Sequence, residues 1–110
     1  MSAERPVIVT VAVLRAATWT LASHLNMGGG GHHFTYSSAD FPEALVCKGW
    51  RKEDGARKGY AHVQVTTRPG WVEDAPLGDL DEVARLITKA RQTVVDDAAW
   101  DAADPARASA

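Results

Sequence analysis

The sequence is short of cysteine, because Cys47 is the only one among 110 residues. A single thiol cannot form a disulfide within its own chain, whereas small secreted domains usually depend on several disulfides. The rest of the composition is ordinary for a globular protein, with 45% hydrophobic and 24% charged residues. We therefore expect a protein that is not secreted.

The sequence also lacks a long, uninterrupted apolar run. Its most apolar stretch, residues 7–27, is broken by Arg15 and again by His24. A membrane-spanning helix needs about 20 consecutive apolar residues, and a signal peptide needs an unbroken apolar segment behind a basic start. Neither requirement is met, so we expect no contact with a membrane.

An excess of one charge is missing as well. The formal net charge is −2, which exerts no overall attraction on nucleic acid or on an anionic membrane. A chain of 110 residues has the length of one domain with one modest core. We expect a single domain over residues 1–110, with flexible ends at 1–6 and 102–110.

No motif for catalysis, cofactor binding or metal binding is present. The candidate metal ligands are His32, His33, Cys47 and His62, but they show neither CxxC nor HxxxH spacing. Neighbouring residues on a strand point to opposite faces, so only one of the two adjacent histidines could join a site. The four glycines at 28–31 are not followed by the lysine of a phosphate-binding loop. We therefore predict no enzyme, no cofactor and no metal; a zinc site or a cysteine nucleophile is the least favoured alternative.

The apolar stretch near the N-terminus has the spacing of a helix. Apolar or small residues recur at alternating steps of four and three, at Val7, Val11, Leu14, Thr18, Leu21 and Leu25. Thr10 is a suitable N-cap and Gly28 a suitable C-terminal stop, which predicts a helix over residues 10–25. The alternative is a strand over residues 7–13, where β-branched residues dominate.

The middle of the chain predicts a β-hairpin. Residues 59–67 alternate between apolar and polar side chains, and residues 44–51 form a second candidate strand, with a helix over 43–48 as the alternative. Between them lies a polar loop with Asp54-Gly55 at its centre, a dipeptide that favours tight hairpin turns.

Shorter segments surround this hairpin. Residues 33–37 alternate and contain two aromatic residues, which predicts a short strand. The glycines at 28–31 predict a helix stop and a mobile loop, and residues 71–78 predict an acidic loop.

A closing helix is predicted from Asp79 onward. Its apolar stripe consists of Leu80, Val83, Ile87, Ala90 and Val94. We expect an ion pair between Asp81 and Arg85, and fraying near Asp97, because acidic residues are unfavourable at a helix C-terminus.

The resulting fold class is α+β, in the order α-β-β-β-α: a small antiparallel sheet of about three strands with two helices packed on one face. The side chains expected in the shared core are Leu14, Leu21, Val63, Val65, Leu80, Val83 and Ile87.

Charged and aromatic residues suggest where partners bind. Basic residues gather on the hairpin, whereas residues 73–82 carry five acidic residues and no basic one. Opposite patches on one small chain suit a contact between neighbouring copies. The predicted partner-binding residues are Trp50, Arg51, Lys52, Arg57, Lys58, Trp71, Asp79 and Asp81.

The order of segments resembles the tail-terminator, or tail-completion, family of long-tailed bacteriophages. The similar stretches are residues 10–25, 40–50, 52–58, 61–67 and 80–94. In that family a helix precedes a proline and a short apolar strand, then a polar hairpin, a strand of the form valine-glutamine-valine and a closing amphipathic helix. The family often adds a further strand after that helix, which residues 95–110 do not resemble.

The resemblance implies a structural protein without catalytic residues. Such a protein forms a homo-oligomeric ring at the head–tail junction and contacts tail-tube and head-completion proteins. It would be found in the virion, or in the host cytoplasm before assembly. The alternative hypothesis is a small accessory protein that binds nucleic acid or a regulatory protein through the basic hairpin at residues 48–68, and non-specific DNA contact is compatible with either.

Overall fold

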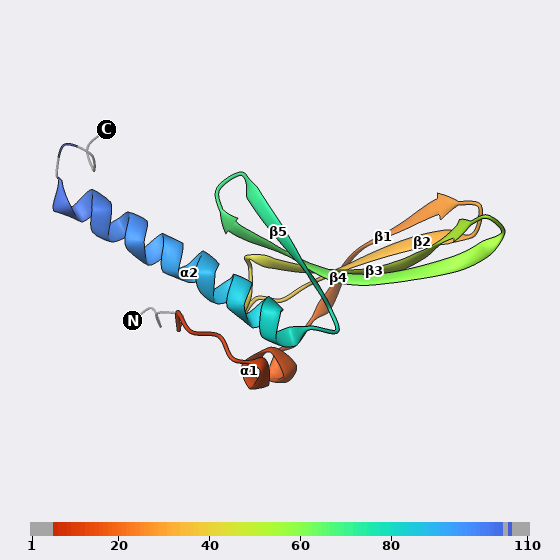
Figure 1. Ribbon diagram of the computed structural model, residues 1–110, viewed down its shortest axis with the longest axis horizontal. Helices are drawn as coiled ribbons and strands as arrows, with labels where there is room; N and C mark the ends of the chain where they lie inside the picture. Colours follow the sequence, from red (N-terminus) through yellow and green to blue (C-terminus); the bar gives the residue numbers. More distant parts are fainter. Residues whose placement is uncertain (1–5, 105, 107–110) are drawn as a thin grey trace.

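The computed structural model describes residues 6–104 and 106. Within that part of the chain, two helices enclose five strands in the sequence (Figure 1). The elements are α1 (Val11–Ala16), β1 (Thr20–Gly28), β2 (Gly31–Ser37), β3 (Ala44–Glu53), β4 (Ala56–Arg68), β5 (Trp71–Pro76) and α2 (Leu80–Ala103).

The strands form one antiparallel sheet in which each strand pairs with its neighbours in the sequence, in the order β1-β2-β3-β4-β5. The α+β class, the antiparallel sheet and the C-terminal helix are confirmed. The expected number of about three strands is wrong, because β1 and β5 lie where a helix and a loop were predicted.

The first helix is much shorter than the predicted 10–25. Thr10 is the N-cap, and its hydroxyl accepts a hydrogen bond from the Val13 N–H, but the helix ends at Ala16. The next residues include Thr18, Trp19 and Thr20, which favour extended backbone, and from Thr20 onward the chain pairs with β2. The strand proposed for residues 7–13 is also absent, since α1 occupies its second half.

The glycine run does not form the predicted mobile loop. Gly28 pairs with Gly31, so the run makes a tight hairpin turn between β1 and β2. Gly28, Gly29 and Gly30 all have positive φ angles, which only glycine adopts without strain. The same glycines that suggested a helix stop therefore connect two strands.

The hairpin over residues 44–67 is confirmed as β3 and β4. Its two-residue turn consists of Asp54 and Gly55, with φ angles of 52° and 77°. Two positive φ angles in a two-residue turn match the right-handed twist of the flanking strands. The acidic loop predicted for residues 71–78 is wrong over most of its length, because β5 pairs there with β4.

Helix α2 begins as predicted. Asp79 is its N-cap and accepts a hydrogen bond from the Glu82 N–H. Arg85 pairs with Glu82 rather than with Asp81. The expected fraying near Asp97 is not seen, since the helix continues to Ala103.

Helix α2 thus covers the first two residues of the range expected as a flexible end, 102–110. Much of that range and nearly all of residues 1–6 lie outside the described residues.

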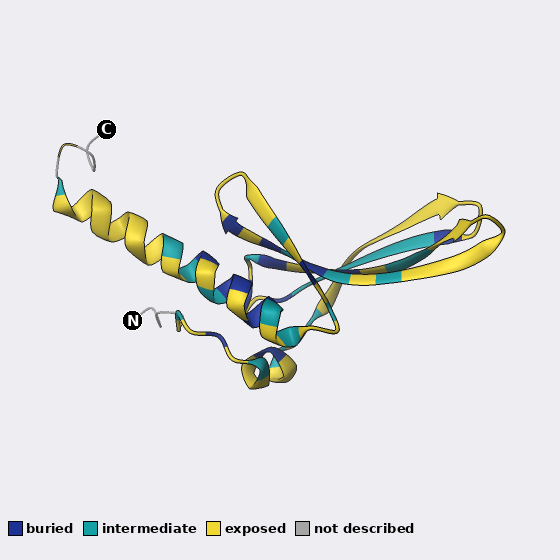
Figure 2. Ribbon diagram, viewed as in Figure 1, coloured by how far each residue is buried: buried dark blue, intermediate teal, exposed yellow. Residues whose placement is uncertain are grey.

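The core lies where the first half of α2 packs on one face of β3, β4 and β5 (Figure 2). Five of the seven expected core residues are buried: Leu14, Val63, Val65, Val83 and Ile87. Leu80 is half-buried, and Leu21 is wrong, with 54% of its surface exposed. Leu21 was assigned to the core through a helical stripe that β1 replaces.

One side chain links segments that are far apart in the sequence. The Arg91 guanidinium on α2 bonds the Glu43 carboxylate at 2.7 Å and the backbone carbonyl oxygens of Pro6 and Asp40 at 2.8 and 2.6 Å. It also lies over the ring of Phe41 at 5.2 Å. Arg91 therefore fixes the N-terminal segment and the β2–β3 connection to α2.

The molecule is elongated, with extents of 59 × 32 × 24 Å. The two hairpins β1–β2 and β3–β4 project beyond the core in one direction, and the last turns of α2 project in another (Figure 1). Both projections are largely exposed (Figure 2). None of the described helices has the length and apolar character needed to cross a bilayer.

Candidate functional site

The projecting hairpins carry a group of aromatic rings on the sheet face that the helices cover further along. Directly opposed residues share a face, so the register places Phe34, Lys48 and Ala61 together, and likewise His32, Trp50 and Gly59. His24 joins them because it is opposite Phe34. We call this surface the tip platform; its residues are His24, His32, Phe34, Tyr36, Lys48, Trp50, Lys52 and Arg57.

The rings of the tip platform are packed against one another. The His24 and Phe34 rings are parallel with centroids 4.4 Å apart, and Trp50 lies 5.8 Å from Phe34 and 5.2 Å from His32. The Trp50 indole N–H donates to the Gly30 carbonyl at 2.9 Å. This bond ties the tips of the two hairpins together and fixes the indole.

Cations border these rings without carboxylates beside them. Arg57 lies 5.3 Å from the Trp50 ring centroid, and Lys48 lies 5.8 Å from that of Tyr36. Lys52 and Arg57 are opposed across the hairpin. Among the described residues, none forms an ion pair with Lys48, Lys52 or Arg57. The platform therefore presents uncompensated positive charge.

On the reverse face of the same hairpin, the basic residues have an acidic neighbour. Arg51 and Lys58 are also opposed there, but Glu53 lies within 3.6 Å of Arg51 and 3.9 Å of Lys58. The basic residues predicted as one patch thus divide between two faces, and one of these pairs has a carboxylate neighbour.

The reverse face also carries a chain of polar contacts. The His33 ring bonds the Tyr60 hydroxyl at 2.6 Å, and the His62 ring bonds the Asp74 carboxylate at 3.3 Å. Tyr60 lies across Gly49, where an added Cβ would come within 2.6 Å of the tyrosine oxygen. The contacts connect β2, β4 and β5 over the surface of β3 and stiffen the sheet.

Cys47 lies on the same face, opposite His62, and is buried. Burial, with a smaller contribution from Asp74, raises the pKa of its thiol above the usual value of 9.0. A raised pKa keeps the thiol protonated, which is unfavourable for a nucleophile. No set of three ligating side chains within the described residues could hold a metal ion.

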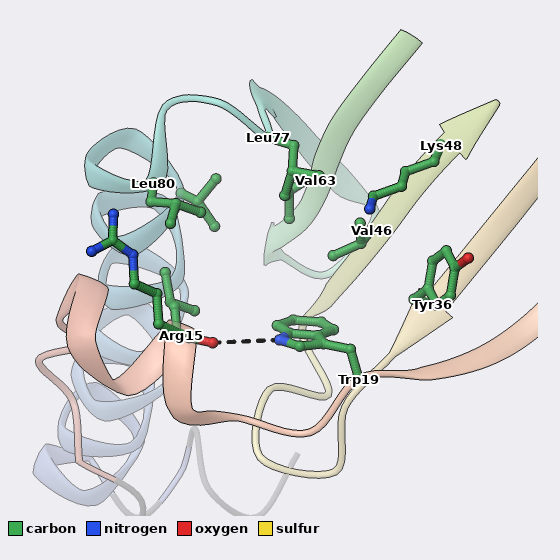
Figure 3. A pocket seen from close by; sticks show the side chains of 10 residues that line it. Arg15, Trp19, Tyr36, Val46, Lys48, Val63, Leu77 and Leu80 are labelled. Atoms are coloured by element: carbon green, nitrogen blue, oxygen red, sulfur yellow. Dashed lines mark hydrogen bonds between the residues drawn. The ribbon is translucent and has the colours of Figure 1, made fainter. Parts of the chain in front are cut away.

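An apolar cleft of about 400 Å³ adjoins the platform where the helices meet the sheet (Figure 3). Trp19, Tyr36, Val46 and Leu77 line its walls, while Arg15 and Lys48 provide charge beside it. The Trp19 ring stacks on Phe41 with centroids 5.8 Å apart. Tyr36 and Lys48 belong to both the cleft and the platform, so the two form one continuous surface.

The predicted partner-binding residues fall into three places. Trp50, Arg51, Lys52, Arg57 and Lys58 lie together on the β3–β4 hairpin. Trp71 lies at the start of β5, with Arg68 over its ring at 5.2 Å, and Asp79 and Asp81 lie at the start of α2.

The acidic segment is partly neutralised within the chain. Glu73 accepts hydrogen bonds from Lys89 at 2.8 Å and Thr67 at 2.6 Å, and these bonds lower the pKa of its carboxyl. The pKa of Glu82 is lowered by its bond from Arg85.

Sequence reasoning missed the platform residues from β1 and β2: His24, His32, Phe34 and Tyr36. Phe34 and Tyr36 are two positions apart in the predicted strand 33–37, which places both on one face and is a usable signal. What was missing was the pairing of that strand with β3, which brings them beside Trp50 and Lys48.

Comparison with known proteins found no matching family model, no matching curated protein and no matching solved structure.

Proposed function

We propose that this protein is a non-enzymatic assembly protein that forms a homo-oligomeric ring. The observation that carries the proposal is the set of large apolar side chains left exposed on the sheet edges and on the projecting end of α2. These are Leu21, Leu25, Met27, Trp71, Val72, Val94 and Val95, each between 47% and 69% exposed. Large apolar side chains left exposed on sheet edges and on a projecting helix end are typical of surfaces that another protein covers.

The shape of the chain supports the same proposal. The radius of gyration is 17.3 Å, whereas a compact chain of this length has a value of about 13 Å. An elongated subunit of this size buries little of its own surface, and contacts with neighbours supply the missing burial.

Two different sheet edges are open on each subunit. Among the described strands, β1 pairs only with β2, and β5 pairs only with β4. Unpaired edges are templates for association. Contact between different edges of neighbouring copies is head-to-tail, and such a contact closes into a ring when the rotation permits.

The charges are compatible with a head-to-tail arrangement. The basic hairpin tip and the acidic start of α2 lie apart in the fold (Figure 1). Taken with the resemblance of residues 40–50, 52–58, 61–67 and 80–94 to the tail-terminator family, this favours a tail terminator at the head–tail junction of a bacteriophage, in contact with tail-tube and head-completion proteins. The protein would then reside in the virion, or in the host cytoplasm before assembly.

The test is the oligomeric state of the purified full chain, measured by size-exclusion chromatography with light scattering and by electron microscopy. We expect discrete multiples of the 11.8 kDa chain, visible as rings. A monomer at every accessible concentration would contradict the proposal.

A pair of matched variants tests the role of the edge. Leu25→Lys places a charge on the edge strand β1, and Leu45→Lys places one at an exposed apolar position of the central strand β3. Leu25→Lys should dissociate the oligomer, while Leu45→Lys should leave it intact and both chains should remain folded. Equal effects of the two variants would exclude β1 as the contact.

A further inference from the structure

The tip platform contains a shallow hollow of about 580 Å³. It exists because large side chains on β3 oppose small ones on β4: Trp50 is opposite Gly59, and Lys48 is opposite Ala61. Phe34 and Tyr36 from β2 also line it, together with Gly49 and Tyr60. A space between aromatic rings, open to solvent, can accept another planar group.

The positive charge around the hollow favours a planar group that belongs to a negatively charged ligand. Lys52 and Arg57 are directly opposed on one face, an arrangement of like charges that is unfavourable without a counter-ion. The hairpin contains only two acidic residues: Glu53, which lies beside the cations of the reverse face, and Asp54, which lies in the turn. A ligand with spaced negative charges would relieve this repulsion.

We propose that the tip platform binds single-stranded nucleic acid without sequence specificity. Unpaired bases enter the hollow between Phe34, Tyr36 and Trp50, and the phosphates follow Lys48, Lys52 and Arg57. Aromatic surfaces combined with a positively charged groove are the features by which proteins bind single strands, because every base has a planar face. A duplex is excluded from this mode since its bases are already paired and stacked.

This inference goes beyond ring assembly and does not depend on it. The platform could also receive an acidic segment of a second copy, such as the projecting end of α2, which carries Asp96, Asp97 and Asp101. Aromatic rings and Lys48 line the hollow, and Lys52 and Arg57 are opposed beside it on the same face, which favours a nucleic acid, in which planar groups and charges alternate. Binding assays distinguish the two occupants.

The experiment measures the anisotropy of a fluorescent oligothymidine of about 15 nucleotides, a length that covers a typical single-strand site. An oligouridine and a DNA duplex of the same length are measured in parallel. We expect both single strands to bind at low salt, and the duplex to bind at least tenfold more weakly. Absence of single-strand binding, or equal binding of the duplex, would overturn the proposal.

Two double variants with the same change in net charge locate the site. Lys48→Gln with Arg57→Gln removes two cations from the platform, and Arg51→Gln with Lys58→Gln removes two from the reverse face. The platform variant should weaken binding at least tenfold and reduce the slope of log affinity against log salt by about 1.4, or about 0.7 per lost phosphate contact. The reverse-face variant should bind within about twofold of the original chain. Equal losses would indicate general attraction by the hairpin charge and overturn the assignment to this face.

A third variant tests the hollow without changing charge. A Cβ at Gly59 meets only the Gly49 carbonyl oxygen, at an ordinary 3.7 Å, so Gly59→Val should fold while filling the space opposite Trp50. It should weaken single-strand binding about fivefold or more, with unchanged thermal stability. If Gly59→Val binds like the original chain, bases do not enter the hollow. If the platform variants instead alter the subunit count in light scattering while single-strand binding persists, a second copy occupies the platform.

Discussion

One face of the sheet is covered by helix in one half and open in the other. In the half nearest the helices, Val46, Val63 and Val65 are buried under α2. In the projecting half, the corresponding positions of the same strands carry Lys48, Trp50 and Arg57. The described helices do not extend over the projecting hairpins (Figure 1). The strands pass from one half to the other without a break in pairing. The change therefore comes from side chains alone, and it separates the part that folds the protein from the part available for binding.

The largest expected effect contrasts the covered core with the open β1 edge of the sheet, by removing apolar volume from each. Ile87 on α2 is fully buried, so Ile87→Ala should lower the free energy of unfolding by about 2–5 kcal/mol. Leu21 on β1 is exposed, and Leu21→Ala should change it by less than about 0.5 kcal/mol. Urea denaturation of both variants measures the difference. A similar loss in the two variants would mean that β1 packs into a core which this fold does not contain.

A smaller loss of stability is expected from adding a side chain at one glycine of the projecting half, Gly49, but not at another, Gly59. A Cβ at Gly49 would clash with the His32 carbonyl oxygen and would lie 2.6 Å from the Tyr60 hydroxyl. Gly49→Ala should therefore cost about 1–3 kcal/mol through overpacking, measured by thermal unfolding. Gly59→Ala is the control, because the space there is open, and it should be neutral within about 0.5 kcal/mol. Equal stability of the two variants would contradict the packing of Tyr60 across β3.

The smallest effect is a dependence on pH at the β5 edge. Bonds from Lys89 and Thr67 lower the pKa of Glu73 from its usual 4.5 in the folded chain. The stability that Glu73 contributes is thus present above the unfolded pKa and is lost as the pH falls through the folded pKa. Glu73→Gln should be less stable than the original chain near pH 7, and the difference should vanish on acidification. Denaturation at a series of pH values measures it, and a difference that grows toward low pH would have the wrong sign.

Local patterns predicted the elements whose partners lie nearby in the sequence. The Asp54-Gly55 turn and the alternation of residues 59–67 predicted the β3–β4 hairpin, and the apolar stripe that follows Asp79 predicted the start of α2. In both cases the secondary-structure propensity, the hydrophobic pattern and the turn or cap residues indicate the same element. A segment is predictable from sequence when these signals agree.

The failures have a common physical cause. Residues 20–25 were the second part of the predicted helix 10–25, but they belong to β1, where pairing with β2 satisfies their backbone groups. Trp71 to Pro76 carry two acidic residues and resemble a loop, yet they pair with the end of β4. Edge strands are exposed, so they lack the buried stripe by which strands are recognised, and only the partner strand defines them.

The candidate site was half predicted for the same reason. Trp50, Lys52 and Arg57 were found as a basic and aromatic hairpin, whereas the division of the cations between two faces follows from the register. Successive residues of a strand point to opposite faces, so a shift of the β3–β4 register by one residue would move each cation to the other face.

The contacts of Arg91 have a consequence for the order of folding. They join residues separated by 85, 51 and 48 positions, whereas the hairpin turns join residues three apart. Closing a long loop costs more chain entropy than closing a short one, so local hairpins can form before distant segments meet. We expect the Arg91 contacts to form after the rate-limiting step, in which case they slow unfolding and leave the folding rate unchanged. Stopped-flow unfolding of Arg91→Ala would measure this, and the arginine would then set how long each folded chain persists.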